Sequence, residues 1–515
     1  MDFKATYTAP CQNTGTATGG TAPYTYQWYQ LINNQPVLLT GYTSATANNL
    51  EYGTYQCVVT DAYGYTITVT IVINYDPNRI VTGLNYIANG THTNETKIFE
   101  RGFIVQAGST VTLNNCNYQF MPGAKVIVEQ GSAPGVTPVI SGGLLTLNGT
   151  TFSSVTACNA RWQGIEVWGN KTAHQYMVNG KYAQGRVAGN NATIKDAVCA
   201  VALWKPGDIS KTGGYIIANG TQFLNNVKSI HAYDYENYMP TSPDIKVDNA
   251  TSITNCTFMM NSQYLPGLLF YKHIDLYKVR GIKINGCDFT VPAGPHPDKA
   301  TYNSAIECWN AGVKIDAPCT NGNVPCNSFD YCNFSNFYRG VLANSTGSNT
   351  YTFSIVRANF TNNAIGIYVN GVKNESILFN NFYLGPNYGD DCAEGNTSYG
   401  VYLDNSSGFL IEENTFQKAT GAPTGTYMGI AANNCKCDQD VIYKNTFTGL
   451  SVGNYAYGIN RSDAGDDGTG LSYRCNLNIS NAVDFRVTGD NENDAKIHGR
   501  IGSTTLASGN TFTSS

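Results

Sequence analysis

Tyrosines and carboxylates alternate in one short stretch, residues 231–238. If this stretch is extended, Tyr233 and Tyr235 lie on one face and Asp234 and Glu236 on the other, because successive side chains of a strand point to opposite sides. Tyrosine rings are amphipathic surfaces that can stack on the C–H faces of sugars. Carboxylates accept hydrogen bonds from sugar hydroxyls. We therefore expect a glycan-binding segment with the binding residues Tyr233, Tyr235 and Tyr238.

The two carboxylates of this stretch also allow a catalytic interpretation. A pair of acidic side chains can act as acid and base on a glycosidic bond, which makes Asp234 and Glu236 the candidate catalytic residues. The competing interpretation is a polar, tyrosine-rich loop that packs on the scaffold, and we favour it on the sequence alone.

A second candidate site is acidic. Asp438 and Asp467 lie 29 residues apart, which is the length of one repeat of this chain, and Asp463 lies beside them. Carboxylates stacked on neighbouring coils would repel each other by roughly a few kcal/mol at an intermediate dielectric constant. A bound Ca²⁺ would remove this conflict. The sequence thus predicts a calcium site at Asp438, Asp463 and Asp467, unless unequal loops splay these side chains into solvent.

Other chemistries are excluded or lack a motif. The six histidines are scattered without metal-ligand spacing, and no nucleophile elbow, phosphate-binding loop or dinucleotide loop occurs. We therefore expect no cofactor other than calcium. A net charge of −5 argues against a nucleic-acid partner. The chain has no run of 18 apolar residues, so we expect no transmembrane segment.

A weak repeat between residues 358 and 460 indicates the scaffold that must position these residues. An Asn-Phe or Asn-Thr-Phe element is followed by Gly-Ile or Gly-Val four times, and the glycines of these pairs are 34, 29 and 29 residues apart. A degenerate repeat of this length is typical of a solenoid, in which each coil buries its apolar face against its neighbours. Short runs of Val, Ile, Tyr, Phe and Thr between Asn, Gly and Asp predict strands. The chain is therefore predicted to be all-β, with a parallel β-helix over residues 80–515.

The length of this segment predicts about 12–15 coils at roughly 30 residues each. The phenylalanines of the repeat are expected to point inward and to stack in a column, since strands of adjacent coils lie roughly 4.8 Å apart. Asparagine is expected at the bends because it tolerates left-handed backbone angles. Long intervals between the repeats should form loops that build the functional face. A repeat-like Asn-Thr-Phe at residues 510–512 leads us to expect that the natural chain continues.

Residues 1–76 have a different pattern. Cys11 is followed by Trp28, and Tyr55 stands two residues before Cys57. This arrangement is that of an immunoglobulin-like sandwich, in which a disulfide joins the two sheets and the tryptophan packs on it. We expect a Cys11–Cys57 disulfide in an N-terminal domain of this class, unless the two cysteines are unrelated.

The remaining cysteines suggest further pairs. Cys256 and Cys287 each stand two residues before a repeat phenylalanine, so they either form a disulfide between coils or stack as thiols. Cys319 and Cys326 could close a small loop. Fifteen cysteines in a chain of low charge favour an oxidising, extracellular compartment, so we expect that a signal sequence was removed before Met1.

Two resemblances accompany these patterns. The segments 19–28, 49–55 and 59–64 resemble the short Ig-like repeats of Bacteroidota surface adhesins linked to gliding motility. The resemblance implies a modular secreted or cell-surface protein and no catalysis. No C-terminal sorting domain of that group is recognisable.

The repeats and the segment 162–167 resemble right-handed parallel β-helix proteins of the pectin-lyase-like superfamily. Hydrolases of that superfamily carry Asn-Thr-Asp, Asp-Asp, Gly-His-Gly and Arg-Ile-Lys motifs, and this chain has only the Asp-Asp pairs at 390–391 and 466–467. The pectate lyase pattern is also missing. Because one fold serves many activities, the resemblance leaves function open.

We therefore predict a secreted or cell-surface adhesive protein that binds a glycan or a surface protein without catalysis. The first alternative is a polysaccharide lyase or glycoside hydrolase that acts in the groove of the β-helix. The second is a self-associating subunit of a surface layer or fibre.

Overall fold

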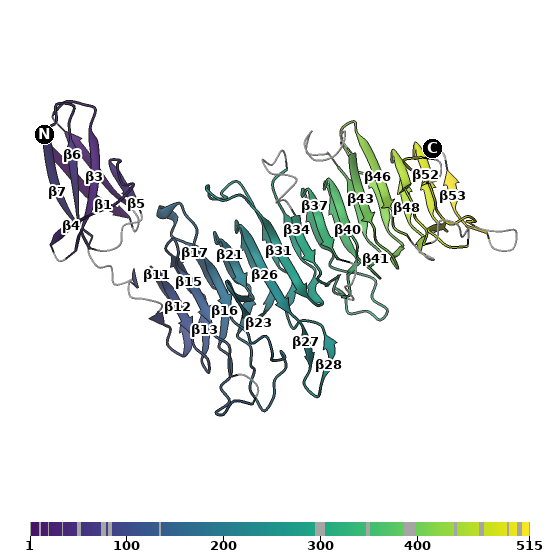
Figure 1. Ribbon diagram of the computed structural model, residues 1–515, viewed down its shortest axis with the longest axis horizontal. Coiled ribbons are helices and arrows are strands. Elements are labelled where there is room, and N and C mark those ends of the chain that lie inside the picture. Colours follow the sequence, from purple (N-terminus) through teal and green to yellow (C-terminus); the bar gives the residue numbers. More distant parts are fainter. Residues whose placement is uncertain are drawn as a thin grey trace.

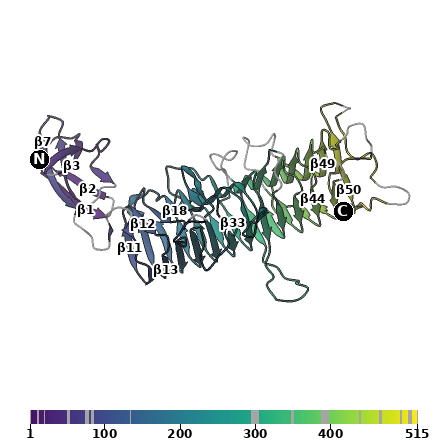
Figure 2. The ribbon, with the colours of Figure 1, turned by 60° about the horizontal axis from the view of Figure 1, so that its bottom comes forward.

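The computed structural model describes residues 2–9, 12–18, 20–32, 34–48, 53–73, 79–80, 85–132, 135–293, 304–346, 351–385, 397–436, 440–462, 468–491, 494–501 and 507–513. In these residues the regular structure is β, apart from one 3-10 turn at Thr156–Cys158. The larger part is a right-handed parallel β-helix, an elongated stack of coils seen from two directions in Figures 1 and 2. No described helix is long and apolar enough to cross a membrane.

Each coil passes through three parallel sheets, which we name A, B and C. The described strands number 14 in sheet A, 13 in sheet B and 15 in sheet C, in agreement with the predicted 12–15 coils. Sheet A contains β9 (Asn85–Tyr86), β12 (Gly102–Val105), β15 (Lys125–Val128), β18 (Gly164–Val167), β21 (Cys199–Ala202), β26 (Lys228–Tyr235), β31 (Lys272–Val279), β34 (Ser304–Trp309), β37 (Arg339–Asn344), β40 (Ile365–Asn370), β43 (Thr397–Asp404), β46 (Thr426–Asn433), β49 (Val452–Tyr457) and β52 (Val483–Thr488).

The other two sheets complete the coils. Sheet B contains β10 (Gly90–Thr93), β13 (Thr110–Asn114), β16 (Leu144–Asn148), β19 (Arg186–Asn190), β24 (Tyr215–Asn219), β29 (Ser252–Thr254), β32 (Ile282–Asn285), β35 (Val313–Asp316), β38 (Ser354–Val356), β41 (Ser376–Leu378), β44 (Leu410–Glu412), β47 (Val441–Tyr443) and β50 (Ser472–Arg474). Sheet C contains β8 (Arg79–Ile80), β11 (Thr96–Phe99), β14 (Asn117–Phe120), β17 (Thr151–Ser154), β20 (Thr193–Lys195), β25 (Gln222–Leu224), β30 (Thr257–Met259), β33 (Asp288–Thr290), β36 (Cys332–Ser335), β39 (Ala358–Thr361), β42 (Asn381–Leu384), β45 (Thr415–Lys418), β48 (Thr446–Thr448), β51 (Leu477–Ile479) and β53 (Thr511–Thr513).

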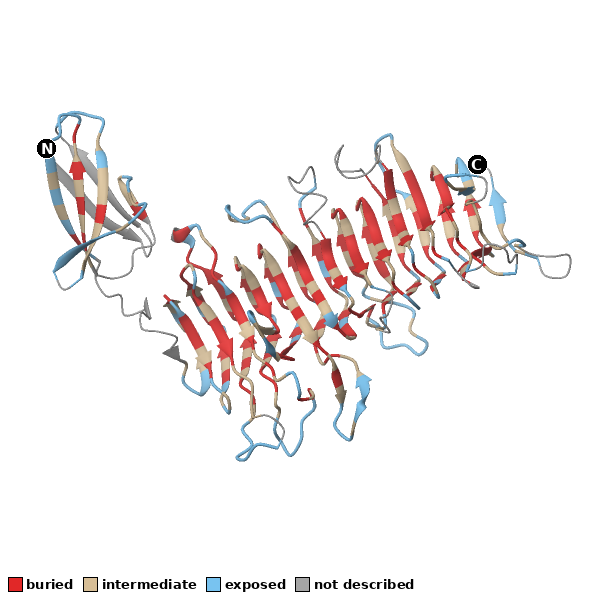
Figure 3. Cartoon of the chain, viewed as in Figure 1, coloured by how far each residue is buried: buried red, intermediate tan, exposed pale blue. Residues whose placement is uncertain are grey.

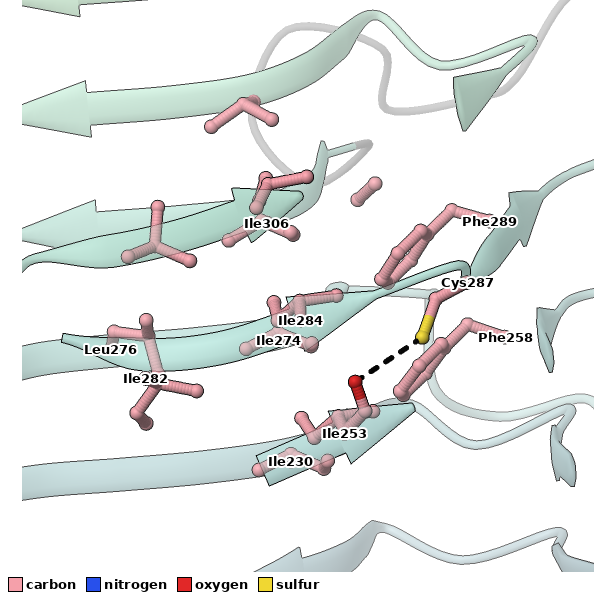
Figure 4. Close-up of a cluster of buried hydrophobic side chains, with 14 of the residues drawn as sticks. Ile230, Ile253, Phe258, Ile274, Leu276, Ile282, Ile284, Cys287, Phe289 and Ile306 are labelled. Atoms are coloured by element: carbon pink, nitrogen blue, oxygen red, sulfur yellow. Dashed lines mark hydrogen bonds between the residues drawn. The ribbon is translucent and has the colours of Figure 1, made fainter. Parts of the chain in front are cut away.

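The inward phenylalanines of sheet C form the predicted column. Neighbouring rings are parallel within 4–9° and their centroids are 4.5–5.0 Å apart, so each ring covers the next at the spacing of the strands. Figure 4 shows two members, Phe258 and Phe289, beside the isoleucines of sheets A and B. The column consists of Phe223, Phe258, Phe289, Phe334, Phe360, Phe382, Phe416 and Phe447. Buried side chains continue along the coils (Figure 3).

The glycines of the repeat are explained by this column. A Cβ on Gly400 would lie 2.5 Å from the ring of Phe416 and 2.7 Å from the carbonyl oxygen of Gly429. Gly366 stands in the same relation to Phe382. A larger residue would displace the stacked rings, so the Gly-Ile pairs and the phenylalanines recur together.

The bends between sheets B and C only partly follow the prediction. Asn255 has a left-handed backbone, with φ of 52°, as expected for asparagine. Farther along the chain Phe379, Glu413 and Lys444 occupy the left-handed position, with φ of 52–58°. The asparagines there follow one residue later and form a buried ladder, in which each side-chain oxygen accepts the backbone N–H of the asparagine one coil before. The ladder consists of Asn380, Asn414, Asn445, Asn476 and Asn510.

The N-terminal residues form two antiparallel sheets. The first contains β1 (Asp2–Ala9), β2 (Gln12–Thr18) and β5 (Thr46–Asn48), and the second contains β3 (Thr25–Ile32), β4 (Gln35–Leu38), β6 (Gly53–Thr60) and β7 (Thr66–Ile73). Trp28, Tyr55 and Cys57 are buried in one cluster, and the Trp28 indole donates to the carbonyl of Ser44 at 2.9 Å. Cys57 is a free thiol, and Cys11 lies outside the described residues. A free Cys57 contradicts the predicted Cys11–Cys57 disulfide.

The two other cysteine pairs differ. The Cys319–Cys326 disulfide is confirmed. Of the two alternatives predicted for Cys256 and Cys287, the disulfide is wrong and the stacked thiols are confirmed, because both cysteines are free. In-register residues of parallel strands project side by side, so the backbone N–H of Cys256 faces the sulfur of Cys287 at 3.4 Å and that of Cys287 faces the sulfur of Cys332 at 3.2 Å. Figure 4 shows the Cys287 sulfur directed to the Ile253 carbonyl.

Candidate functional site

The outer face of sheet A gathers ionisable and aromatic side chains over β26, β31 and β34. On these strands Ile230, Ile274 and Ile306 point inward and are fully buried. The residue after each isoleucine points outward, and the register places them side by side. This outward column reads His231, Asp275 and Glu307.

An aromatic stack lies beside this column. The Trp204 ring covers Tyr233 with centroids 4.6 Å apart, and Tyr233 covers Tyr277 at 4.7 Å, with interplanar angles of 19° and 15°. Trp204 comes from β22 (Trp204–Lys205), which leaves sheet A and pairs with β23 (Asp208–Thr212). Trp309 follows Tyr277 in register on β34, and its side chain is 44% exposed. The face thus presents aromatic edges that end at an exposed indole ring.

Two ion pairs tie neighbouring coils together next to the stack. Lys228 Nζ lies 2.5 Å from Asp275 Oδ2, and Lys272 pairs with Glu307. Lys272 is only 2% exposed, and the Tyr271 ring lies 4.0 Å from its ammonium group and 5.0 Å from that of Lys228. Burial opposes ionisation of Asp275, but the charges of Lys228 and Lys272 outweigh it and hold the pKa of this carboxyl below its usual value.

His231 is a neutral hydrogen-bond acceptor at this site. Burial lowers the pKa of His231 to about 4, and the charge of Lys228 acts in the same direction. Its Nδ1 accepts the Trp204 indole N–H at 3.2 Å, because an indole can only donate. The proton of the neutral ring is therefore on Nε2, which lies 3.7 Å from Asp275 Oδ2. The lone pair of His231 is occupied, so the ring has no basic nitrogen directed to a ligand.

The predicted alternation of residues 233–236 is wrong. Asp234 has a left-handed backbone, with φ of 43°, and Lys278 on the next coil matches it with φ of 49°. The extra turn points Tyr235 inward, so Tyr233 is on the outer face and Tyr235 is buried. The Tyr235 hydroxyl donates to the carbonyl of Ala173 at 2.6 Å, which gives this residue a role in holding a loop rather than a ligand.

The predicted carboxylates do not form an open acid pair. Asp234 pairs with Lys171 from another loop. Glu236 accepts the Tyr351 hydroxyl at 2.6 Å. Each thus joins separate segments of chain, and neither is directed to the face that carries Tyr233.

Tyr238 also anchors a loop. It lies in β27 (Asn237–Met239), which forms a hairpin with β28 (Ser242–Val247). Its hydroxyl donates to the carbonyl of Thr172 at 2.7 Å, and its ring meets His174 edge-on at 5.5 Å. These contacts agree with the interpretation of a tyrosine-rich segment packed on the scaffold, except at Tyr233.

A buried amide network fixes the loop beside β26. The Gln184 amide donates to the carbonyls of Asn170 and Ala173 at 3.0 and 2.7 Å. Gln175 donates to the carbonyl of Gly213 at 3.0 Å and accepts the N–H of Ala250 at 2.7 Å. Both glutamines are at least 96% buried. Satisfied buried networks rigidify a site, so this loop is held in one position before any ligand binds.

The predicted calcium site would involve loops on neighbouring coils. Asp438, Asp463 and Asp467 lie outside the described residues, and among the residues that are described no group of three potential metal ligands occurs. Asp440, their described neighbour, accepts the N–H of Gly408 at 2.8 Å.

Sequence reasoning found Tyr233 but missed the role of His231 and the partners of both side chains. Insertions separate these partners along the chain, since Ile230, Ile274 and Ile306 are 44 and 32 residues apart. Aligning each buried isoleucine of sheet A and comparing the next residue would have revealed the column. The missed residues are Trp204, Lys228, Lys272, Asp275, Tyr277, Glu307 and Trp309.

Comparisons with known proteins add little. No protein-family model matches this chain, and no curated protein matches it. Among solved structures, a crystal structure of a mutant of the periplasmic alginate epimerase AlgG is similar, with a TM-score of 0.34 and 9% sequence identity over 79% of this chain and 78% of that one. A similarity at this level says nothing about what this chain binds.

Proposed function

We propose that this chain is a secreted or cell-surface protein that binds a polysaccharide on the outer face of sheet A without cleaving it. The observation that carries this proposal is the stack of Trp204, Tyr233 and Tyr277 along the coils, with the exposed ring of Trp309 next in register. Aromatic surfaces with a few placed polar groups are typical of ligand sites. The strand spacing of roughly 4.8 Å resembles the length of one pyranose unit, so a sugar chain along the coils meets similar groups at each step.

The charges of the site favour a neutral polysaccharide. Lys228 and Lys272 are each paired with a carboxylate of the next coil, and Lys125 pairs with Glu166 at 2.8 Å. An anionic polymer would have to compete with these carboxylates for the lysines, and removing one partner of a buried pair is costly. A neutral chain leaves the pairs intact and can use the outer oxygens as hydrogen-bond acceptors.

The same pairs argue for binding rather than catalysis. A general acid needs a proton at the working pH, whereas Asp275 is held ionised by Lys228 and Lys272. A general base needs a free lone pair, whereas His231 Nδ1 accepts from Trp204. Buried ionisable groups also gather at the active sites of enzymes, so a polysaccharide lyase or hydrolase is the second candidate.

Binding to immobilised xylan, mannan, β-glucan, alginate and polygalacturonate tests the proposal. The wild type should bind a neutral polymer, and Tyr233→Ala with Tyr277→Ala should weaken binding at least tenfold, which is about 1.4 kcal/mol. Tyr383→Ala is the matched control, because Tyr383 is a partly exposed tyrosine on β42 of sheet C. Retention of full affinity by the double variant would overturn the proposal. New reducing ends or unsaturated products would establish the enzyme instead.

A further inference from the structure

A second aromatic platform lies on the same outer face, toward the C-terminal end of the β-helix. Tyr368 on β40 and Tyr402 on β43 are in register, with parallel rings 5.3 Å apart. Tyr399 meets the Tyr402 ring edge-on at 5.0 Å. Tyr368 and Tyr402 belong to the column that holds His231, Asp275 and Glu307 farther up the sheet, so one surface carries both aromatic groups.

Hydrogen-bonding groups accompany this platform. Asp404 accepts from the Asn433 amide at 3.1 Å and from the Asn405 amide at 2.9 Å, and the Tyr368 hydroxyl approaches it at 3.4 Å. The Arg339 guanidinium lies over the Tyr368 ring, 5.5 Å from its centroid. The edges of these stacked rings, flanked by amides and a carboxylate, can contact a sugar ring and its hydroxyls.

The distance between the two platforms follows from the strand order. β26, β31, β34, β37, β40 and β43 are consecutive in sheet A, so Tyr233 and Tyr402 are five strand spacings apart, about 24 Å. Trp309 lies between them with an exposed ring, and Asn344 follows it in register on β37.

We propose that one neutral polysaccharide chain lies along the coils and contacts both platforms at once. This inference rests on the proposed function, since it extends the same ligand along the same face. The second contact is then intramolecular, so a chain that reaches both platforms gains affinity without any new type of contact. A chain too short to reach gains nothing.

Size-fractionated oligomers of xylan, mannan and β-glucan, from dimers to dodecamers, provide the test by calorimetry. For the polymer that binds, affinity should rise at least tenfold once the oligomer spans about 24 Å. Tyr368→Ala with Tyr402→Ala should remove this rise and leave the affinity for short oligomers unchanged. Tyr383→Ala should change neither. If the double variant unfolds, Tyr402→Leu, which keeps apolar volume at the site, should still lower the affinity for long oligomers.

The outcomes separate the two proposals. The second platform alone would be overturned if short oligomers bind the wild type and the affinity does not rise with oligomer length. It would also be overturned if the rise in affinity survives in the Tyr368/Tyr402 variants. Binding of short oligomers that Tyr233→Ala with Tyr277→Ala leaves unchanged would overturn the proposed function. Failure of every oligomer to bind would overturn both.

Discussion

The inner and outer faces of sheet A differ in how regularly their residue types repeat from coil to coil. Inside, Ile230, Ile274 and Ile306 are followed along the sheet by buried Val and Ile side chains as far as Ile430, so these coils repeat an aliphatic residue at one position. Outside, the neighbouring column changes from His231 through Asp275, Glu307 and Leu342 to Tyr368. Packing fixes the inside, because each coil must cover the next at native density. The chemistry of this protein is therefore expected where the repeat breaks, on the outside.

The largest effect should come from a carboxyl group buried inside the β-helix. Glu375 is fully buried before β41, and neither of its carboxyl oxygens has a side-chain hydrogen-bond partner among the described residues. Burial raises its pKa to about 8, so the folded state retains this proton where the unfolded chain has lost it. Stability is then complete below the unfolded pKa of 4.5 and is lost as pH rises through about 8.

Glu375→Gln removes this dependence. Between pH 4 and pH 9 the variant should gain about 5 kcal/mol of unfolding free energy relative to the wild type, measured by denaturant unfolding at each pH. Identical pH profiles for the two proteins would show that the carboxyl is not protonated in the folded state.

The phenylalanine column should show the next largest effect. Phe334→Ala opens a cavity between the rings of Phe289 and Phe360 and should cost about 4 kcal/mol. Tyr383→Ala, on the outside of the same sheet, should cost less than about 1 kcal/mol. Thermal unfolding of the two variants measures the difference, and equal losses in melting temperature would contradict the contrast between the inner and outer faces.

Asparagines allow the same comparison of inside and outside with polar residues, because one asparagine column is buried and another lies on the outer face of sheet C. Asn414→Ala leaves the backbone N–H of Asn380 and the carbonyl of Ile377 without their side-chain partners, which should cost about 2–3 kcal/mol. Asn359→Ala on the outside of sheet C breaks the partly buried hydrogen bonds with Asn333 and Asn381 and should cost about 0.5–1 kcal/mol. Chemical denaturation of both variants measures the difference, and a larger loss for Asn359→Ala would contradict it.

The smallest effect is expected from salt. Because the lysines of the outer face are already paired with carboxylates, binding of a neutral polysaccharide should change less than about twofold between 0.05 and 0.5 M NaCl. Calorimetry at both concentrations measures it. A steep fall in affinity would mean that unpaired charge recognises the ligand.

The inside could be predicted from the sequence because packing links distant residues. Gly400 and Phe416 recur together since a Cβ on the glycine would meet the ring, and this contact produced the visible repeat. The short spacing of Cys319 and Cys326 was also sufficient to predict their disulfide. The left-handed position of Phe379 was not predictable from propensity, since the buried asparagine beside it fixes the bend instead.

The outside could be predicted only in part. Tyr233 was found, but Tyr235 was placed on the wrong face because the left-handed Asp234 breaks the alternation of the strand. Trp204 and Tyr277 come from other coils, and no packing rule links their identities to Tyr233. Their proximity follows from the register, which long insertions conceal.

Hydroxyl-radical footprinting with and without the bound polysaccharide tests the central claim most directly. The ligand should protect Trp204, Tyr233, Tyr277 and Trp309 on the outer face of sheet A, while Tyr383 on sheet C and Tyr443 on sheet B should react as before. Protection of Tyr383 or Tyr443, with the outer face of sheet A unchanged, would contradict the account.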